Sequence, residues 1–357
     1  METKAFARTG WDVSRLGLGT YFLTSDRGVP HREAVAVVRR ALALGVNLVD
    51  TAPLYGRGEA EQIVGEALSG TEGHCRIIEK VGNFECSILA PVARQSYRDA
   101  DYIRIQFEHS LRVLGRQSVD LLLVHEADWD EWWGDGDLAK APVVAVLETL
   151  KHEGLAEHIG VSARNPVAAA ALCESGLFDA ILYVHYFNLV WQEAGETVLS
   201  VAASMGMGTA VGAVYRQGLL IDPDIRTLAR LRMEHRADVP PGIISRIEGA
   251  LRIAREAGMS LPELGLRFLL GHPYVGTVLV GPRTVLELEE NVEWAERGPL
   301  PAELHQMVVA LRETEIGAWT TSQRVISAAS SEFGALREVA KGAVRRARKA
   351  ARGPRRW

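Results

Sequence analysis

Short apolar runs alternate with longer amphipathic segments along most of the chain. The runs are apolar almost throughout, as expected for parallel strands that are buried on both faces. They predict eight strands: Leu16–Thr20, Val46–Thr51, Arg76–Lys80, Val119–His125, His158–Ser162, Ala180–Tyr186, Gly208–Val214 and Gly276–Gly281.

The segments between these runs carry apolar residues at helical spacing. They predict helices over Arg32–Leu44, Glu59–Leu68, Tyr102–Leu114, Val143–Glu153, Val167–Glu174, Glu196–Met205, Ile243–Ala257 and Val285–Glu296. A strand followed by a helix, repeated in this way, predicts a parallel sheet with the helices outside it. The expected fold is therefore α/β, a (β/α)8 TIM barrel.

Three segments fall outside the repeat. Residues Lys4–Val13 alternate around a Thr-Gly turn and predict a β-hairpin that plugs the bottom of the barrel. Asp128–Lys140 and Gln217–Pro241 predict long loops that follow strands, on the face where barrel enzymes have their active sites. Loops of this length are either functional or disordered, and this position favours function.

The composition is that of a soluble globular protein. The 357 residues are 47% hydrophobic and 24% charged, and the net charge of −5 indicates no particular partner. There is no apolar stretch of the roughly eighteen residues that a membrane span needs, and the N-terminus lacks the apolar run of a secretion signal. Three cysteines at no metal-like spacing predict no metal site and no disulfide framework, and a cytoplasmic location fits best.

The C-terminus differs from the rest of the chain. Residues 335–357 contain nine Lys or Arg and one acid, Glu338. We expect one barrel over residues 1–315, an extension over 316–334 and a basic tail over 335–357 that is partly helical or disordered. The tail is either a solubilising extension or a basic helix that makes weak contact with an anionic surface. No recognition motif points to nucleic acid, and the oligomeric state is left open.

Three predicted strands end in side chains that are capable of acid–base chemistry. Asp50, Lys80 and His125 end the second, third and fourth strands, and Tyr55 follows Asp50 after one short turn. In a barrel these positions meet at the carboxyl ends of the strands. Each residue has a structural alternative, such as a helix cap, a surface charge, a core histidine or a packing aromatic ring.

Together the four residues can move a proton onto a carbonyl oxygen. A tyrosine with an ordinary pKa of about 10 is a weak acid at neutral pH unless a cation stabilises the phenolate. We expect Lys80 to lower the pKa of Tyr55, Asp50 to hold Lys80, and His125 to orient the substrate oxygen. The hydride must come from a cofactor, because no side chain donates one.

At this point the sequence resembles the aldo-keto reductase family, over roughly residues 4–313. Several matches stand in the order the family has them: Leu16–Thr20; Asn47–Gly56 with Glu59 and Gly65; Val119–His125; Glu153-Gly154 followed by Ile159–Ser162; and Val278–Arg283 with Leu288–Val292. The resemblance implies a nicotinamide cofactor held without a Rossmann fold and a small-molecule carbonyl or alcohol as substrate. It assigns the catalytic roles to Asp50, Tyr55, Lys80 and His125.

The resemblance also implies cofactor contacts. Ser162 would hold the nicotinamide carboxamide, and Gly218 and Leu219 would cover the pyrophosphate. Gly281, Arg283 and Asn291 would hold the adenosine end. Gly19, Thr20 and Asp50 are expected to line the same site.

The chain departs from the family pattern at three positions of the expected cofactor site. Ala163 replaces the asparagine that commonly follows the carboxamide-binding serine, and Asn165 is a candidate substitute. Val184 replaces a common glutamine, so Tyr183 or Tyr186 could stack on the cofactor instead. Glu287 stands where some members bind a 2′-phosphate with arginine, which favours NAD(H). Arg283 and the habit of the family favour NADP(H), by a small margin.

The tryptophans of the loop after His125 are candidate substrate contacts. Trp129, Trp132 and Trp133 could stack on a sugar or an aromatic ring, or could instead anchor the loop on the barrel rim. Tyr21 is added to this predicted pocket. The acids around the tryptophans disfavour an anionic substrate.

The sequence therefore predicts an NAD(P)H-dependent oxidoreductase that interconverts a carbonyl and its alcohol. The alternative is a non-catalytic nucleotide-binding regulator of the same fold, since potassium-channel β subunits resemble this family. A metal-dependent hydrolase lacks support, because no HxH pair or carboxylate cluster ends the strands.

Overall fold

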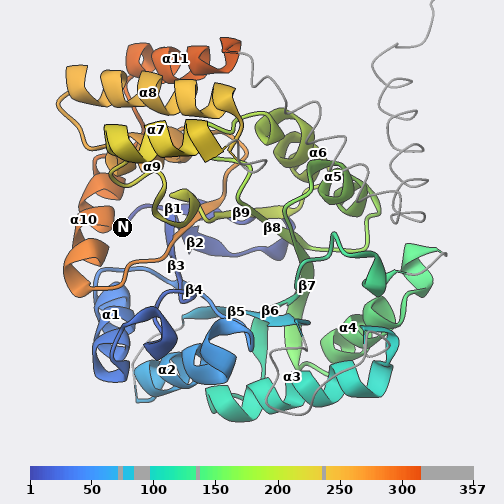
Figure 1. Cartoon of the computed structure of the whole chain (residues 1–357). Coiled ribbons are helices and arrows are strands. Elements are labelled where there is room, and N and C mark those ends of the chain that lie inside the picture. The colour runs from blue at the N-terminus through green and yellow to red at the C-terminus, as the bar shows by residue number, and fades with distance from the viewer. Residues whose placement is uncertain (71–74, 84–96, 134–136, 235–238, 315–357) are drawn as a thin grey trace, which may run out of the picture.

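Eight parallel strands close into a barrel (Figure 1). A computed structural model describes residues 1–70, 75–83, 97–133, 137–234 and 239–314. The strands follow one another around the barrel in the order β10-β3-β4-β5-β6-β7-β8-β9, which confirms the predicted (β/α)8 fold. They are β3 (Leu16–Gly19), β4 (Leu48–Asp50), β5 (Arg76–Val81), β6 (Val119–Val124), β7 (Ala156–Ala163), β8 (Ala180–Val184), β9 (Gly208–Gly212) and β10 (Thr277–Val280).

Two apolar clusters lie on the two faces of the barrel wall. Side chains alternate along each strand, so one set points into the barrel and the other toward the helices. Ile78 of β5 packs in the cluster inside the barrel, whereas Ile77 and Val81 of the same strand pack in the larger cluster with the helices. Burial on both faces explains why the strands read as continuous apolar runs.

The N-terminal hairpin is present as predicted. Strand β1 (Thr3–Ala5) pairs antiparallel with β2 (Asp12–Ser14), and Phe6 and Trp11 between them are buried. The Phe6 ring lies against β9, where a Cβ added to Gly208 would come within 2.4 Å of it. The hairpin therefore seals the end of the barrel opposite the loops that follow the strands.

In the described ranges, eight helical segments surround the barrel (Figure 1). They are α1 (His31–Ala43), α2 (Glu59–Leu68), α3 (Ala100–Leu114), α4 (Pro142–His152), α5 (Pro166–Glu174), α6 (Ser200–Ser204) after the π-helical turn η8 (Gly195–Leu199), α9 (Leu261–Leu270) and α10 (Val285–Glu296).

One helix of the predicted repeat lies elsewhere. The predicted helix Ile243–Ala257 corresponds to α8 (Pro241–Glu256), which packs outside α9 with α7 (Ile225–Glu234) and α11 (Ala302–Ala310). The helix that packs on β10 is α9, which the sequence pattern did not reveal. All residues of this short helix are buried, and its only two charged residues, Glu263 and Arg267, pair with each other at 3.0 Å, so no solvated polar face marks it.

The two predicted long loops contain helical structure. The stretch Gln217–Pro241 includes α7, so its interpretation as a loop was wrong in part. The stretch Asp128–Lys140 forms the 3-10 turns η6 (Asp130–Trp132) and η7 (Leu138–Lys140). The predicted extension and basic tail, residues 316–357, lie outside the described residues. No helix in the described ranges has the length and apolarity needed to cross a membrane.

Candidate active site

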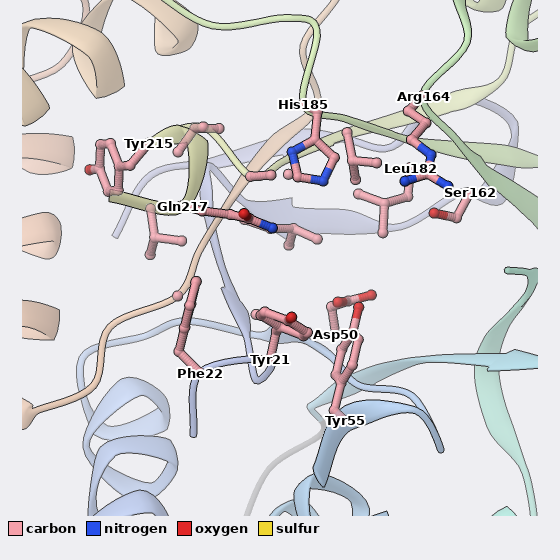
Figure 2. Close-up of a pocket in the computed structure, with 18 of the residues that line it drawn as sticks. Tyr21, Phe22, Asp50, Tyr55, Ser162, Arg164, Leu182, His185, Tyr215 and Gln217 are labelled. Atoms are coloured by element: carbon pink, nitrogen blue, oxygen red, sulfur yellow. The ribbon is translucent and has the colours of Figure 1, made fainter. Parts of the chain in front are cut away.

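A cavity of about 580 Å³ opens at the carboxyl ends of the barrel strands. Figure 2 shows Tyr21, Asp50 and Tyr55 on one side of it and Ser162, Leu182, Arg164 and His185 on the other. Non-glycine residues with positive φ are concentrated in the loops that follow the strands, among them Glu126, His185 and Gln217. Such strained backbone is typical of functional sites.

Asp50 and Lys80 form a buried ion pair beneath the cavity. The Lys80 ammonium lies 2.5 Å from the Asp50 carboxylate and donates a second bond of 2.6 Å to the Thr51 carbonyl. The Lys80 side chain is only 1% exposed. Burial raises the pKa of Asp50, while the neighbouring Lys80 charge acts in the opposite direction. The predicted support of Lys80 by Asp50 is therefore present as a direct contact.

Tyr55 lines the cavity directly above this pair. The Lys80 ammonium lies 4.8 Å from the centre of the Tyr55 ring, and the His125 ring centre is 6.0 Å away. The turn that presents Tyr55 needs the following glycine: Gly56 has φ +58°, and a Cβ there would come within 2.7 Å of Thr24. The short turn after β4 thus places the Tyr55 phenol beside the Lys80 ammonium.

The pKa of Tyr55 differs from the sequence-based expectation. Burial, followed by the charges of Asp50 and Glu79, holds this pKa well above its ordinary value, whereas we expected Lys80 to lower it. The physical reason is that burial, together with the two nearby carboxylates, outweighs the effect of the Lys80 charge. Tyr55 is consequently a phenol, and the cation is placed to stabilise charge that develops on it.

His125 borders the cavity on the side of β6. Its side chain is buried, and burial, then the charges of Lys80 and Arg164, hold the pKa of His125 well below its usual range. The ring is therefore neutral, with one nitrogen as donor and the other as acceptor. Its Nδ1 has no hydrogen-bond partner among the described residues.

Seven of the predicted cofactor residues line the cavity: Gly19, Asp50, Ser162, Gly218, Gly281, Arg283 and Glu287. These residues line one cavity that extends from Asp50 at the end of β4 to Glu287 of α10. At its far end, Arg283 and Glu287 form an ion pair of 3.2 Å.

The other predicted cofactor residues do not line the cavity. Thr20 is buried and donates to the Asp50 carbonyl. Asn165, the candidate carboxamide ligand, caps α5 by accepting from the amides of Val167 and Ala168, and it is not among the residues that line the cavity. Leu219 packs on the core. Asn291 accepts a bond of 2.5 Å from the Tyr215 hydroxyl, and only Tyr215 reaches the cavity.

The three tryptophans were expected to contact substrate, but they pack behind the loop and do not line the cavity. Trp132 and Trp133 are buried, and their indole N–H groups donate to the carbonyls of His125 and Ala127. Trp129 is partly buried and is not in the cavity wall. This corrects the predicted substrate wall: large rings with one polar atom fill the space behind the loop. Tyr21 does line the cavity.

Several polar residues of the cavity were not singled out from the sequence. Arg164 pairs with Glu126 at 2.8 Å, and both line the cavity. His185 also lines it, and burial, followed by the charge of Arg216, lowers its pKa to about 4. Their positions could have indicated them, because Arg164 directly follows β7 and His185 directly follows β8. Among the described residues, no cluster of His, Cys, Asp and Glu could hold a metal ion.

Known proteins resemble this chain over most of its length. The chain is 26% identical over 324 residues to pyridoxal 4-dehydrogenase of Microbacterium luteolum, covering 83% of this chain and 93% of that one. It is 28% identical to L-galactose dehydrogenase of Arabidopsis thaliana, covering 82% and 87%. A solved aldo-keto reductase of Bacillus halodurans, in its holo form, superposes with a TM-score of 0.68 at 25% identity, covering 87% and 96%.

The family assignment rests on a match to nearly the whole described barrel. Residues 15–313 match the model of the Aldo/keto reductase family. The relatives are dehydrogenases and oxidoreductases, and the barrel carries an acid, a lysine, a tyrosine and a histidine at the mouth of one cavity. The chain therefore belongs to the aldo/keto reductase family of NAD(P)-dependent oxidoreductases.

Proposed function

We propose that Tyr55 is the general acid and base of a hydride-transfer reaction between a carbonyl compound and its alcohol. The observation that supports this most directly is the cluster of three groups: the Tyr55 phenol at the cavity, the Lys80 ammonium 4.8 Å from the centre of its ring, and the Asp50 carboxylate 2.5 Å from the ammonium. The nicotinamide cofactor, when bound, supplies or accepts the hydride.

In the direction of reduction, the Tyr55 hydroxyl gives its proton to the carbonyl oxygen as negative charge develops there. The raised pKa of Tyr55 keeps the proton on the phenol until that moment. Lys80 then stabilises the phenolate, so its charge acts on the transition state more than on the ground state. The neutral His125 ring donates a hydrogen bond that orients the substrate oxygen.

The cavity residues fit a dinucleotide in chemistry as well as in position. Ser162 lies at the end of β7 in the cavity wall and can hold the carboxamide, while Gly218 and Gly281 leave room for a chain of phosphates or sugars. Because Asn165 is used as a helix cap, we propose that Arg164, whose guanidinium enters the cavity, replaces it as the second polar group near Ser162.

The substrate is proposed to be a hydroxyl-bearing aldehyde or the sugar-like ring that such an aldehyde forms. Relatives named for pyridoxal, L-galactose and D-threo-aldose suggest this class. The polar cavity residues Glu126, Arg164 and His185 can exchange hydrogen bonds with several hydroxyl groups.

We expect NADH to bind more tightly than NADPH. The family habit favours NADP(H), but Arg283 is paired with Glu287, whose carboxylate would repel a 2′-phosphate and can accept from a free 2′-hydroxyl. Parallel fluorescence titrations of both cofactors measure the ratio of Kd values. Glu287→Gln should shift that ratio toward NADPH, and Glu290→Gln, at an exposed position of α10, is the matched control. Tighter NADPH binding by the unchanged chain would overturn this preference.

A panel of sugars, aromatic aldehydes and pyridoxal-like hydroxyaldehydes, assayed in both directions with both cofactors, tests the proposed reaction. Steady turnover of any of them supports an enzyme. Tight cofactor binding with no turnover across the panel would favour the non-catalytic regulator instead.

A further inference from the structure

A buried carboxyl group lies directly behind the catalytic lysine. Glu79 precedes Lys80 on β5, and because side chains alternate along a strand it points away from the barrel interior, toward the helices. Its side chain is 0% exposed. One oxygen, Oε1, accepts a hydrogen bond of 2.7 Å from the backbone N–H of Lys80.

This bond replaces a bond of the sheet. In the β4–β5 register Asp50 is paired with Ile78, and the Thr51 N–H donates to the Ile78 carbonyl. The even spacing of a parallel ladder would next join the Lys80 N–H to the Thr51 carbonyl. Here the Thr51 carbonyl accepts the Lys80 ammonium instead. The Glu79 carboxyl thus satisfies the backbone donor at the point where the ladder ends.

A second buried acid accompanies Glu79. Glu61 of α2 is 1% exposed and interacts with Ser110 of α3. Glu61 Oε1 and Glu79 Oε2 have no hydrogen-bond partner among the described residues. Two buried carboxylates that act on each other, each with one oxygen lacking a partner, are unfavourable as two negative charges, and one shared proton removes most of that cost.

We propose that Glu79 is a positioning residue for Lys80, and that Glu79 and Glu61 keep at least one proton between them, so that the number of protons on the pair tunes the acidity of Tyr55. The carboxyl of Glu79 fixes the backbone at Lys80 so that the ammonium reaches both Asp50 and the Thr51 carbonyl. This inference rests on the proposed function, in which Tyr55 transfers the proton.

The charges around the pair indicate the direction of its effect. Asp50 from β4 and Lys80 from β5 act on Glu79, Glu61 faces it from α2, and α3 contributes the uncharged Ser110 to Glu61. Burial raises the pKa of Glu61 to about 7. Burial, then the Glu61 charge, raises the pKa of Glu79.

Loss of the first of the pair's two protons should therefore slow reduction. The Glu79 charge contributes to the raised pKa of Tyr55, after burial and Asp50, so a negative charge shared by the pair makes Tyr55 a weaker acid. We expect kcat/KM for carbonyl reduction to decrease as the pH rises through about 7, the pKa of Glu61.

Three variants separate the positioning role from the charge. Glu79→Gln keeps an oxygen acceptor for the Lys80 N–H but cannot ionise, so kcat at pH 6 should stay within roughly threefold of the unchanged chain while the decrease near neutral pH disappears. Glu79→Leu removes the acceptor and should lower kcat about tenfold without changing the cofactor Kd. Glu61→Gln should abolish the decrease near neutral pH and leave kcat at pH 6 unchanged. Glu66→Gln, exposed on the same helix, is the control and should change neither property.

A second measurement does not depend on turnover. Carboxyl-carbon NMR of protein labelled at glutamate should show a carboxyl that titrates near neutral pH, absent from Glu61→Gln and from Glu79→Gln but retained in Glu66→Gln. Persistence of that signal in both buried variants, or equal kcat in Glu79→Leu and the unchanged chain, would overturn the inference. If the folded protein binds cofactor but turns over no substrate, the proposed function fails while the titration still decides whether the pair shares a proton.

Discussion

Tyr55→Phe should lower kcat/KM for carbonyl reduction by about 10²–10⁴-fold, the usual contribution of a positioned general acid. The cofactor Kd should stay near its original value. The substitution removes one oxygen and leaves the ring against Tyr21 and above Lys80, so the shape of the cavity is preserved. Steady-state rates across pH 6–9 and a parallel cofactor titration measure the two quantities.

The neighbouring Tyr21 provides the comparison for this experiment. It lines the same cavity with its ring centre 5.2 Å from that of Tyr55, but its hydroxyl accepts a hydrogen bond from Arg27, whereas the Lys80 ammonium bonds to Asp50 and the Thr51 carbonyl. Tyr21→Phe should change KM and leave kcat within roughly threefold, because it removes binding without removing the acid. Unchanged turnover in Tyr55→Phe would remove the proposed mechanism.

Lys80→Met should both abolish turnover and destabilise the protein by roughly 3–5 kcal/mol, because it leaves the Asp50 carboxylate buried without its cation. Urea unfolding at constant pH measures the loss. In the double variant Asp50→Asn/Lys80→Met, no charge is left unpaired, so much of the stability should return while turnover does not. Equal stability of the single and double variants would contradict this account.

The cost of Lys80→Met should depend on pH in a definite direction. Burial already raises the pKa of Asp50 above the ordinary value of an aspartate, and removal of Lys80 raises it further. A carboxyl with a raised folded-state pKa is favourable while protonated and loses that advantage as the pH rises above the unfolded value. The deficit should therefore be small near pH 4 and grow toward pH 7. Lys151→Met, which breaks a partly exposed pair with Asp179, is the control and should cost no more than about 1 kcal/mol.

The arrangement of the catalytic residues could be predicted because it depends on local rules. Asp50 and Lys80 end neighbouring parallel strands, and strand ends in a closed barrel converge whatever the details of packing. Tyr55 follows by one turn whose conformation is set by Gly56. The buried ion pair therefore follows from strand order alone.

The outer helices and the cavity wall could not be predicted in the same way. Helix α9 is short and mostly apolar, and its two charged residues are buried as an ion pair, whereas the longer α8 has the amphipathic pattern of a barrel helix but packs one layer further out. Trp132 and Trp133 are as compatible with a substrate wall as with a core, and only their hydrogen bonds to backbone carbonyls decide between the two.

By itself, the sequence determined the barrel, the order of its strands and the four residues at its mouth, because each of these depends on spacing along the chain. The tertiary structure alone decided which way each charge acts. Asp50 neutralises Lys80, Glu287 pairs with Arg283, and Glu79 lies buried behind the lysine. Electrostatic effects depend on distance and burial in three dimensions, and neither quantity can be obtained from the order of residues.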